Sequence, residues 1–147
     1  RLDPTYKRIT FRGSDEFPML TIVCISDTHG YHDGLVVPPG DLLIHAGDLT
    51  RRGTLPEVRA FDHWLGKLPH PRKVVIAGNH DWCFEREPDE ARGAITNAVY
   101  LLDESVEVSG LKVYGSPWQP RFFDWAFNVD RGPPIAAIWA NIPADTD

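Results

Sequence analysis

The stretch Leu-Thr-Ile-Val-Cys-Ile-Ser-Asp-Thr-His-Gly, residues 20–30, indicates the class of fold. Its first part, Leu20–Ile25, is an apolar run rich in β-branched side chains, and a polar turn with glycine follows at once. Similar runs recur at Leu42–His45 and Val74–Ala77. Short apolar runs of this kind, bounded by turns, are typical of buried strands in a parallel sheet. The pattern therefore predicts an α/β fold.

The chain between and after these runs supplies helices and a hairpin. Thr54 and Glu57 form a capping-box pattern, and apolar residues at helical spacing follow, so a crossover helix should connect the second and third strands. The sequence further predicts a short helix within 85–97 and a last short helix from Ile135 to Ile142. It predicts strands at Val99–Leu102, Val106–Val108 and Leu111–Tyr114. Ser109-Gly110 alone separates two of these strands, which predicts a tight hairpin and a second sheet near the first.

Composition limits the class of protein. The chain has 147 residues, 42% of them hydrophobic, and a net charge of −6, which suits one soluble domain over 1–147 and disfavours a nucleic-acid partner. Its longest uncharged stretch, 132–144, has 13 residues and is too short for a membrane span. Cys24 and Cys83 form no disulfide framework, so a reducing cytoplasm is expected.

Polar side chains follow the first three predicted strands. Asp27 and His29 follow the first, Asp48 the second, and Asn79 and His80 the third. In open α/β sheets ligands bind at the carboxyl ends of the strands, so these groups should converge on one site. Carboxylate, amide and imidazole ligands suit Mn, Fe or Zn, and thiolates that mark structural zinc are not among them. The sequence predicts a metal centre.

The spacing suggests phosphoester chemistry. Asp27 and His29 are two apart, and in an extended segment they would point the same way. Glycines precede Asp48 and Asn79 and would let the backbone turn sharply. If Asp48 bridged two ions about 3.5–4 Å apart, a bridging hydroxide could attack phosphorus. His80 could then protonate the leaving oxygen, with Asp81 orienting it.

These motifs resemble those of a known family. Asp27-x-His29, Gly47-Asp48 and Gly78-Asn79-His80-Asp81 resemble the calcineurin-like metallophosphoesterases, whose pattern is D-x-H, G-D, G-N-H-[D/E]. Residues 25–29, 43–48, 64–66 and 114–118 look like the metallophosphoesterase-domain-containing branch, which includes cyclic-nucleotide phosphodiesterases. The resemblance covers about residues 19–143.

The resemblance implies a fold, an activity and residue roles. The fold would be a sandwich of two mixed sheets with flanking helices, and the activity a phosphodiesterase with two divalent ions, Mn favoured. Asp27, His29 and Asp48 would hold the first ion, Asp48 and Asn79 the second, and His80 would serve the leaving group. The substrate would be a small phosphoester such as a cyclic nucleotide.

The chain departs from the family pattern at its end. The family continues with a strand ending in a metal-binding His and a G-H-x-H-like motif, whereas this sequence stops at Asp147. We therefore expect about two-thirds of the family's domain, from its N-terminal part, and either self-association or binding of a missing C-terminal segment. A catalytically incomplete metal-binding or scaffold fragment is the alternative to an active phosphodiesterase.

Other polar and aromatic residues have ordinary interpretations. His45 is expected to be a hydrogen-bonded core histidine, and His32, His63 and His70 are expected to be solvated. Arg51 and Arg52 could steer a phosphate or form a solvated pair. Three aromatic residues are expected in the core: Trp118, Trp125 and Phe127. The alternative is that the aromatic stretch forms a wall on which a base stacks.

Overall fold

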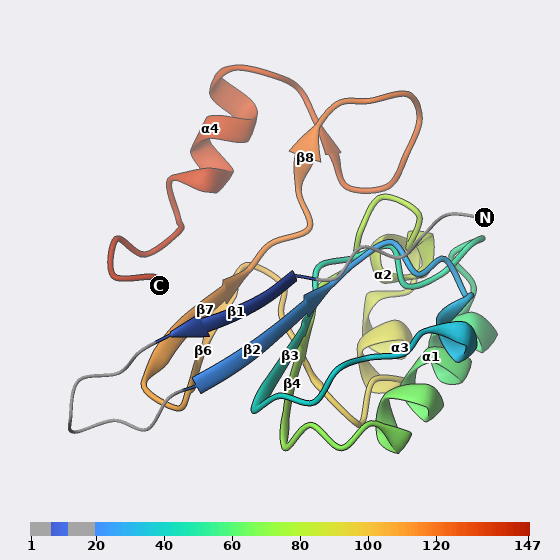
Figure 1. The fold of residues 1–147 in the computed structure, drawn as a ribbon. Helices are drawn as coiled ribbons and strands as arrows, with labels where there is room; N and C mark the ends of the chain where they lie inside the picture. The colour runs from blue at the N-terminus through green and yellow to red at the C-terminus, as the bar shows by residue number, and fades with distance from the viewer. Residues whose placement is uncertain (1–6, 12–19) are drawn as a thin grey trace.

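The main sheet has five strands in the order β1-β2-β3-β4-β5 (Figure 1). The computed structural model describes residues 7–11 and 20–147, and of 7–11 it describes only the backbone. The strands are β1 (Lys7–Phe11), β2 (Leu20–Ile25), β3 (Leu42–His45), β4 (Arg72–Val75) and β5 (Val99–Tyr100). Strands β2 to β5 run parallel to one another, and β1 is antiparallel to β2, so the predicted α/β sheet is confirmed.

Helices cover one face of this sheet. They are α1 (Leu55–Lys67), α2 (Trp82–Arg86) and α3 (Pro88–Gly93). The carboxylate of Glu57 accepts the backbone N–H of Thr54 at 3.1 Å, as the predicted capping box requires. Val58, Phe61 and Leu65 of α1 are fully buried in the larger core, against side chains of β2, β3 and β4. The strand, helix, strand order predicted from the sequence thus packs as a helix layer on a sheet layer.

A two-stranded antiparallel sheet covers the opposite face. It consists of β6 (Glu104–Val108) and β7 (Leu111–Gly115), joined by Ser109 and Gly110. Both turn residues have left-handed backbone, with φ of 52° and 82°, which matches the twist of a tight hairpin. Val108 packs with Ile22, Leu42 and Val74 of the main sheet in a second core. The molecule therefore has helix, sheet and hairpin layers.

The last part of the chain extends beyond these layers (Figure 1). β8 (Gln119–Pro120) and β9 (Asn128–Val129) pair in parallel within the aromatic segment, and α4 (Pro133–Trp139) follows. The backbone N–H of Asp147 donates to the carbonyl oxygen of Lys112 at 3.1 Å, so the end of the chain lies against β7.

Several predictions from the sequence were wrong in detail. Strand β5 ends at Tyr100 and not at Leu102, and β6 begins at Glu104 and not at Val106. Strand β4 begins and ends two residues before the predicted 74–77, because pairing with β3 includes Arg72 and Lys73, which composition alone did not mark. His32 and His70 are 4% and 2% exposed, not solvated. His32 packs against aromatic rings of α1, and His70 shares a hydrogen bond of 2.9 Å with the carbonyl oxygen of Pro38.

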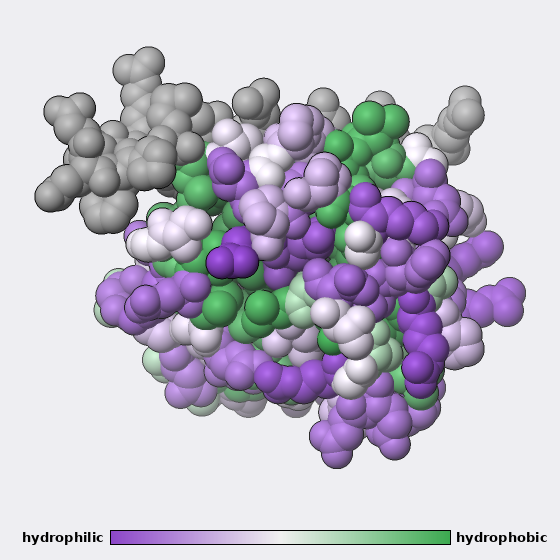
Figure 2. Space-filling view, turned by 90° about the horizontal axis from the view of Figure 1, so that it is seen from below, coloured by the Kyte–Doolittle hydropathy of each residue, from purple (hydrophilic) through white to green (hydrophobic). Residues whose placement is uncertain are grey.

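No helix among residues 7–11 and 20–147 combines the length and the apolar character needed to cross a bilayer. The face seen from below is mostly hydrophilic, with small separate hydrophobic areas (Figure 2).

Candidate functional site

The loops after β2 and β3 run side by side at the carboxyl edge of the main sheet. The backbone N–H of Asp27 donates to the carbonyl oxygen of Gly47 at 3.0 Å, and that of His29 donates to the carbonyl oxygen of Asp48 at 2.9 Å. These bonds continue the pairing of β2 with β3 past the ends of both strands. The sequence-predicted site therefore forms at the expected edge of the sheet.

Three of the site residues have left-handed backbone. The φ angles are 58° at Asp27, 44° at His29 and 57° at Asp48. Such conformations cost on the order of 1–3 kcal/mol each in non-glycine residues and cluster at functional sites. The prediction that residues 27–29 are extended was therefore wrong. A turn brings the side chains of Asp27 and His29 together, and Thr28 between them points into the core.

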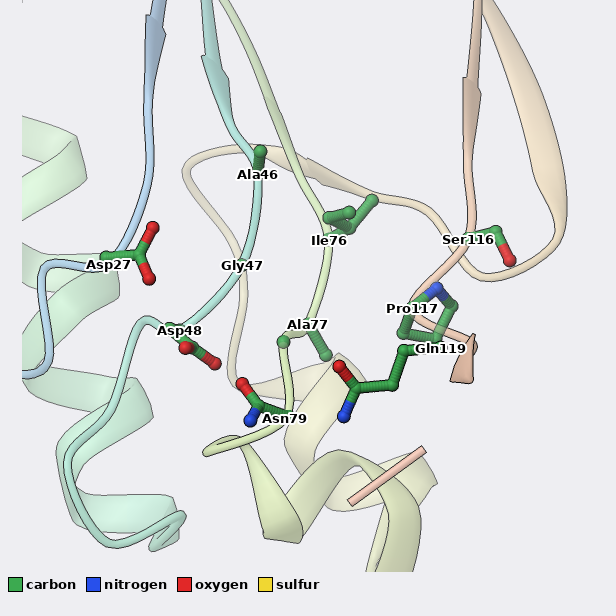
Figure 3. A pocket seen from close by; sticks show the side chains of 11 residues that line it. Asp27, Ala46, Gly47, Asp48, Ile76, Ala77, Asn79, Ser116, Pro117 and Gln119 are labelled. Carbon is green, nitrogen blue, oxygen red and sulfur yellow. The ribbon is translucent and has the colours of Figure 1, made fainter. Parts of the chain in front are cut away.

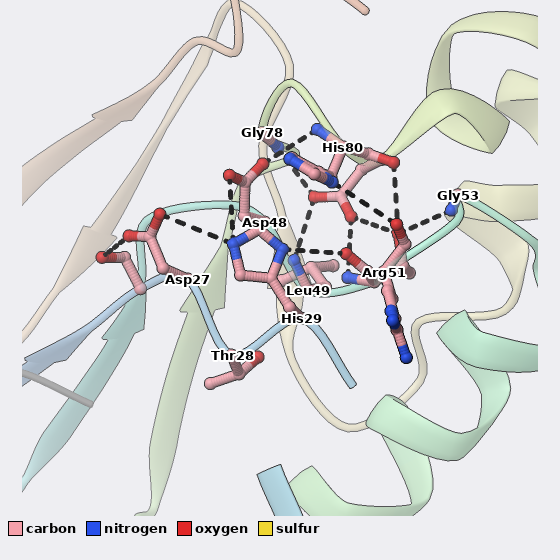
Figure 4. A network of polar contacts seen from close by, with 12 residues as sticks. Asp27, Thr28, His29, Asp48, Leu49, Arg51, Gly53, Gly78 and His80 are labelled. Carbon is pink, nitrogen blue, oxygen red and sulfur yellow. Dashed lines mark hydrogen bonds and ion pairs between the residues drawn. The ribbon is translucent and has the colours of Figure 1, made fainter. Parts of the chain in front are cut away.

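The imidazole of His29 faces two carboxylates (Figure 4). Its Nε2 lies 3.9 Å from Oδ1 of Asp27 and 3.7 Å from Oδ2 of Asp48. Its Nδ1 lies 3.3 Å from the carbonyl oxygen of Thr50, to which Nδ1–H can donate, and this leaves Nε2 as the ring nitrogen that could bind a cation. Two ligand atoms about 2.1 Å from one ion can be at most about 4.2 Å apart. The His29–Asp27 pair and the His29–Asp48 pair therefore each lie close enough to share a divalent cation.

Asn79 reaches the same carboxylate from the other side. Its amide lies 3.0 Å from both oxygens of Asp48. The amide nitrogen can donate there, and with a cation between the two groups the amide oxygen would turn to face it. The backbone N–H of His80 also donates to Oδ1 of Asp48, at 2.9 Å. Asp48 is thus contacted from the loops after β2 and β4.

Two glycines make this approach possible. A Cβ at Gly78 would lie 2.3 Å from Oδ1 and 2.4 Å from the backbone nitrogen of Asp48. A Cβ at Gly47, whose φ is 101°, would lie 2.8 Å from the Cα of Gly78. The expected sharp turn is confirmed at Gly47, whereas at Gly78 glycine is required by the close approach of Asp48 and not by a turn.

His80 lies beside His29. The ring centroids are 4.5 Å apart, and Nδ1 of His80 lies 3.4 Å from the carbonyl oxygen of Arg51. Each of His29, Asp48 and His80 offers one possible ligand atom, and these three atoms all lie within 4.8 Å of one another. His80 is thus a further group that could reach a cation here, in addition to the role predicted for it.

Asp81 does not orient His80, contrary to expectation. Its carboxylate is fully buried and accepts four hydrogen bonds, from the backbone N–H groups of Leu49, Thr50 and Gly78 and from the hydroxyl of Thr50. Burial raises the pKa of Asp81, and the accepted hydrogen bonds act in the opposite direction. Its role is to tie the loop after β3 to the loop after β4.

A pocket of about 290 Å³ opens next to Asp48 (Figure 3). Asp27, Asp48 and Asn79 line one side, and Ser116, Pro117 and Gln119 line the other. Sequence reasoning missed Ser116 and Gln119 as site residues, although both follow the end of β7, and the strand-end rule could have indicated them. No Lys or Arg is among the residues that line this pocket.

The prediction of a core position is confirmed for His45 and for part of the aromatic set Trp118, Trp125 and Phe127. His45 is fully buried, burial lowers its pKa to about 3, and its Nε2 lies 3.0 Å from the hydroxyl of Thr28. Phe127 is 2% exposed and Trp118 packs against it. Trp125 instead contacts His80, with ring centroids 4.0 Å apart.

Comparisons with known proteins identify the family. Residues 20–144 match the family model described as calcineurin-like phosphoesterase. The chain is 40% identical to metallophosphoesterase domain-containing protein 1 of Homo sapiens and of Mus musculus, over 85% of this chain and 45% of each relative. It is 42% identical to UPF0046 protein C25E10.12 of Caenorhabditis elegans, over 85% of this chain and 50% of that protein. The chain thus spans about half the length of these relatives.

Proposed function

Because this chain belongs to the calcineurin-like phosphoesterase family, we propose that it forms the active site of a metal-dependent phosphodiesterase with two divalent cations, manganese favoured. The family match supports phosphoester hydrolysis, and the choice of diesters and of two cations is our proposal. We also place the protein in the cytoplasm, since Cys24 and Cys83 are both free thiols.

One observation carries the proposal: Asp48 is contacted from two sides by groups that can hold cations. His29 lies 3.7 Å away on one side, and the amide of Asn79 lies 3.0 Å away on the other. Within the described part of the chain, the ion pairs of Asp27 and Asp48 involve His29 and no Lys or Arg. Two nearby carboxylates without a basic partner favour bound cations.

The residues then take distinct roles. We assign Asp27, His29 and Asp48 to the first cation, and Asp48 and Asn79 to the second. When bound, divalent cations supply positive charge to a phosphoryl group and lower the pKa of water. His80 would hold a proton for the leaving oxygen, because its Nδ1 faces the carbonyl oxygen of Arg51 and leaves the other ring nitrogen available.

The pocket supports a small diester as substrate. Its wall opposite the carboxylates contains neutral groups, those of Ser116, Pro117 and Gln119. A diester carries one negative charge and a second ester group, which a neutral wall can accommodate, whereas a dianionic monoester would gain more from a basic side chain. We therefore propose a small phosphodiester, such as a cyclic nucleotide, as the natural substrate.

Hydrolysis of bis-p-nitrophenyl phosphate tests the proposal. The chain should hydrolyse it with Mn²⁺ and not with excess chelator, and Asp48→Asn should abolish turnover. Asp33→Asn, which changes an exposed carboxylate outside the pocket, serves as the matched control and should retain activity. Turnover by Asp48→Asn at the level of the unchanged protein would contradict the mechanism.

The alternative is a metal-binding fragment without activity of its own. It is favoured by the small ligand set of the second cation, for which we can name only Asp48 and Asn79 among the described residues. Titration calorimetry with Mn²⁺ separates the two possibilities. One bound ion and no hydrolysis would favour the fragment, and two ions per chain would count against it.

A further inference from the structure

The aromatic segment 116–129 is attached to the loop that carries His80. The backbone N–H of Ala126 donates to the carbonyl oxygen of Asn79 at 3.1 Å, and that of Phe127 donates to Oε1 of Glu85 at 3.0 Å. Ala126 and Phe127 are buried, at 0% and 2% exposure. Trp125 precedes this anchor directly, so its position relative to His80 is set by backbone contacts and by burial.

Bonds within the segment also restrain it. The backbone N–H of Gln119 donates to the carbonyl oxygen of Phe127 at 3.0 Å, and that of Arg121 donates to the carbonyl oxygen of Val129 at 2.8 Å. The side chain of Asn128 accepts from the backbone N–H of Phe122 at 3.1 Å. The loop between β8 and β9 is therefore closed on itself, and Trp125 is not a freely moving side chain at its tip.

The imidazole of His80 has contacts from different segments. Trp125 packs on it at 4.0 Å with an interplanar angle of 40°, and His29 meets it edge-on at 4.5 Å. Its ring hydrogen bond, to the carbonyl oxygen of Arg51, is long at 3.4 Å. A bond of this length restrains a ring weakly, so packing against Trp125 must contribute much of the restraint on its rotation.

We propose that Trp125 is a positioning residue, which holds the imidazole of His80 in the orientation from which it protonates the leaving oxygen. This inference rests on the proposed function. As water attacks phosphorus and the ester bond breaks, the electron pair stays on the leaving oxygen and the proton of His80 goes to it. The proton that the water releases restores His80, and the products are a phosphate monoester and an alcohol, which stay on one molecule when the diester is cyclic.

The kinetic test compares two diesters of similar shape. Bis-p-nitrophenyl phosphate has a good leaving group that needs little protonation, whereas diphenyl phosphate has a poorer one that depends on an acid. Trp125→Leu should lower kcat for diphenyl phosphate about tenfold or more, within the usual range for an acid catalyst, and should leave KM nearly unchanged. Its effect on bis-p-nitrophenyl phosphate should be less than about threefold.

Two further variants separate positioning from general damage. Trp125→Phe keeps an aromatic face and should retain most of the activity on diphenyl phosphate. Phe123→Leu changes an aromatic residue of the same loop that is 73% exposed, and should have no effect. In a His80→Ala background, Trp125→Leu should cause no further loss. Equal losses on both diesters, or an additive loss in that background, would overturn the proposal.

A structural readout tests the contact without activity. In the metal-free chain, the ring protons of His80 should show an upfield shift in the NMR spectrum, caused by the ring current of Trp125. Trp125→Leu should remove this shift, and an unchanged His80 signal would refute the positioning role by itself. A chain that binds Mn²⁺ but hydrolyses neither diester would instead refute the proposed function.

Discussion

Asp81→Asn tests whether the hydrogen bonds that join the loops after β3 and β4 are needed for stability and for metal binding. Each oxygen of Asp81 accepts two hydrogen bonds: Oδ1 from the backbone N–H and the hydroxyl of Thr50, and Oδ2 from the backbone N–H groups of Leu49 and Gly78. An amide in either orientation places an NH₂ group against two of these donors. The variant therefore loses two bonds to a charged acceptor.

The expected cost follows from this count. A hydrogen bond to a charged group contributes about 1.5–3 kcal/mol, so two of them amount to roughly 3–6 kcal/mol of unfolding free energy. For a chain of this size, that corresponds to a fall in melting temperature of about 6–24 °C. Urea denaturation followed by circular dichroism measures the first quantity, and a thermal scan the second.

Asp62→Asn provides a matched control. Asp62 is also buried and also accepts two hydrogen bonds on each oxygen, from Thr96 and Asn97, but it lies on α1 away from the pocket. Both variants should lose comparable stability. Below both melting transitions, only Asp81→Asn should weaken Mn²⁺ binding in calorimetry. A stability within about 1 kcal/mol of the unchanged chain, or equal Mn²⁺ losses in both variants, would refute this reasoning.

Three further predictions concern single contacts. Gly78→Ala should displace Asp48, because the added Cβ would lie 2.4 Å from the backbone nitrogen of Asp48. The variant should lower the unfolding free energy by about 1–3 kcal/mol in urea titration and should weaken Mn²⁺ binding. Unaltered Mn²⁺ affinity would contradict this prediction. His45 stays neutral in the folded chain, because burial lowers its pKa from 6.5 to about 3, so its contribution to stability is complete above pH 6.5 and is lost as pH falls towards 3. Relative to His45→Gln, the unfolding free energy should therefore fall by up to about 1.4 kcal/mol per pH unit over that window, and parallel pH profiles would argue against it. Gln119→Ala removes a polar group from the pocket wall and should raise KM for a diester about fivefold with little change in kcat; an effect confined to kcat would exclude a binding role.

Much of the fold could be predicted from local pattern, and its limits have a physical cause. Leu20–Ile25 and Leu42–His45 were predicted with the correct bounds, because both runs are almost wholly apolar between polar turns. The start of β4 could not be read in the same way, since Arg72 and Lys73 belong to the strand through pairing with β3. Pairing partners far along the chain are invisible to composition.

The candidate site was predictable in its position and less so in its geometry. The rule for strand ends brought Asp27, His29 and Asp48 to one edge, and in the structure carboxylate oxygens of both aspartates lie within 3.9 Å of the imidazole of His29. The left-handed turns that orient them depend on bonds between neighbouring loops, and no spacing rule encodes those bonds. The contact between Trp125 and His80 joins distant parts of the chain and carries no periodic signal.

At the proposed ligand residues, the left-handed backbone lowers the stability of the fold where the proposed function needs a carboxylate. Glycine would adopt φ near 58° at Asp27 or 57° at Asp48 without the strain that a carboxylate-bearing residue has there. A library of this chain screened for heat resistance alone should therefore enrich glycine at these positions and lose the proposed metal ligands. A screen that also demands Mn²⁺ binding should keep both aspartates and gain its stability elsewhere.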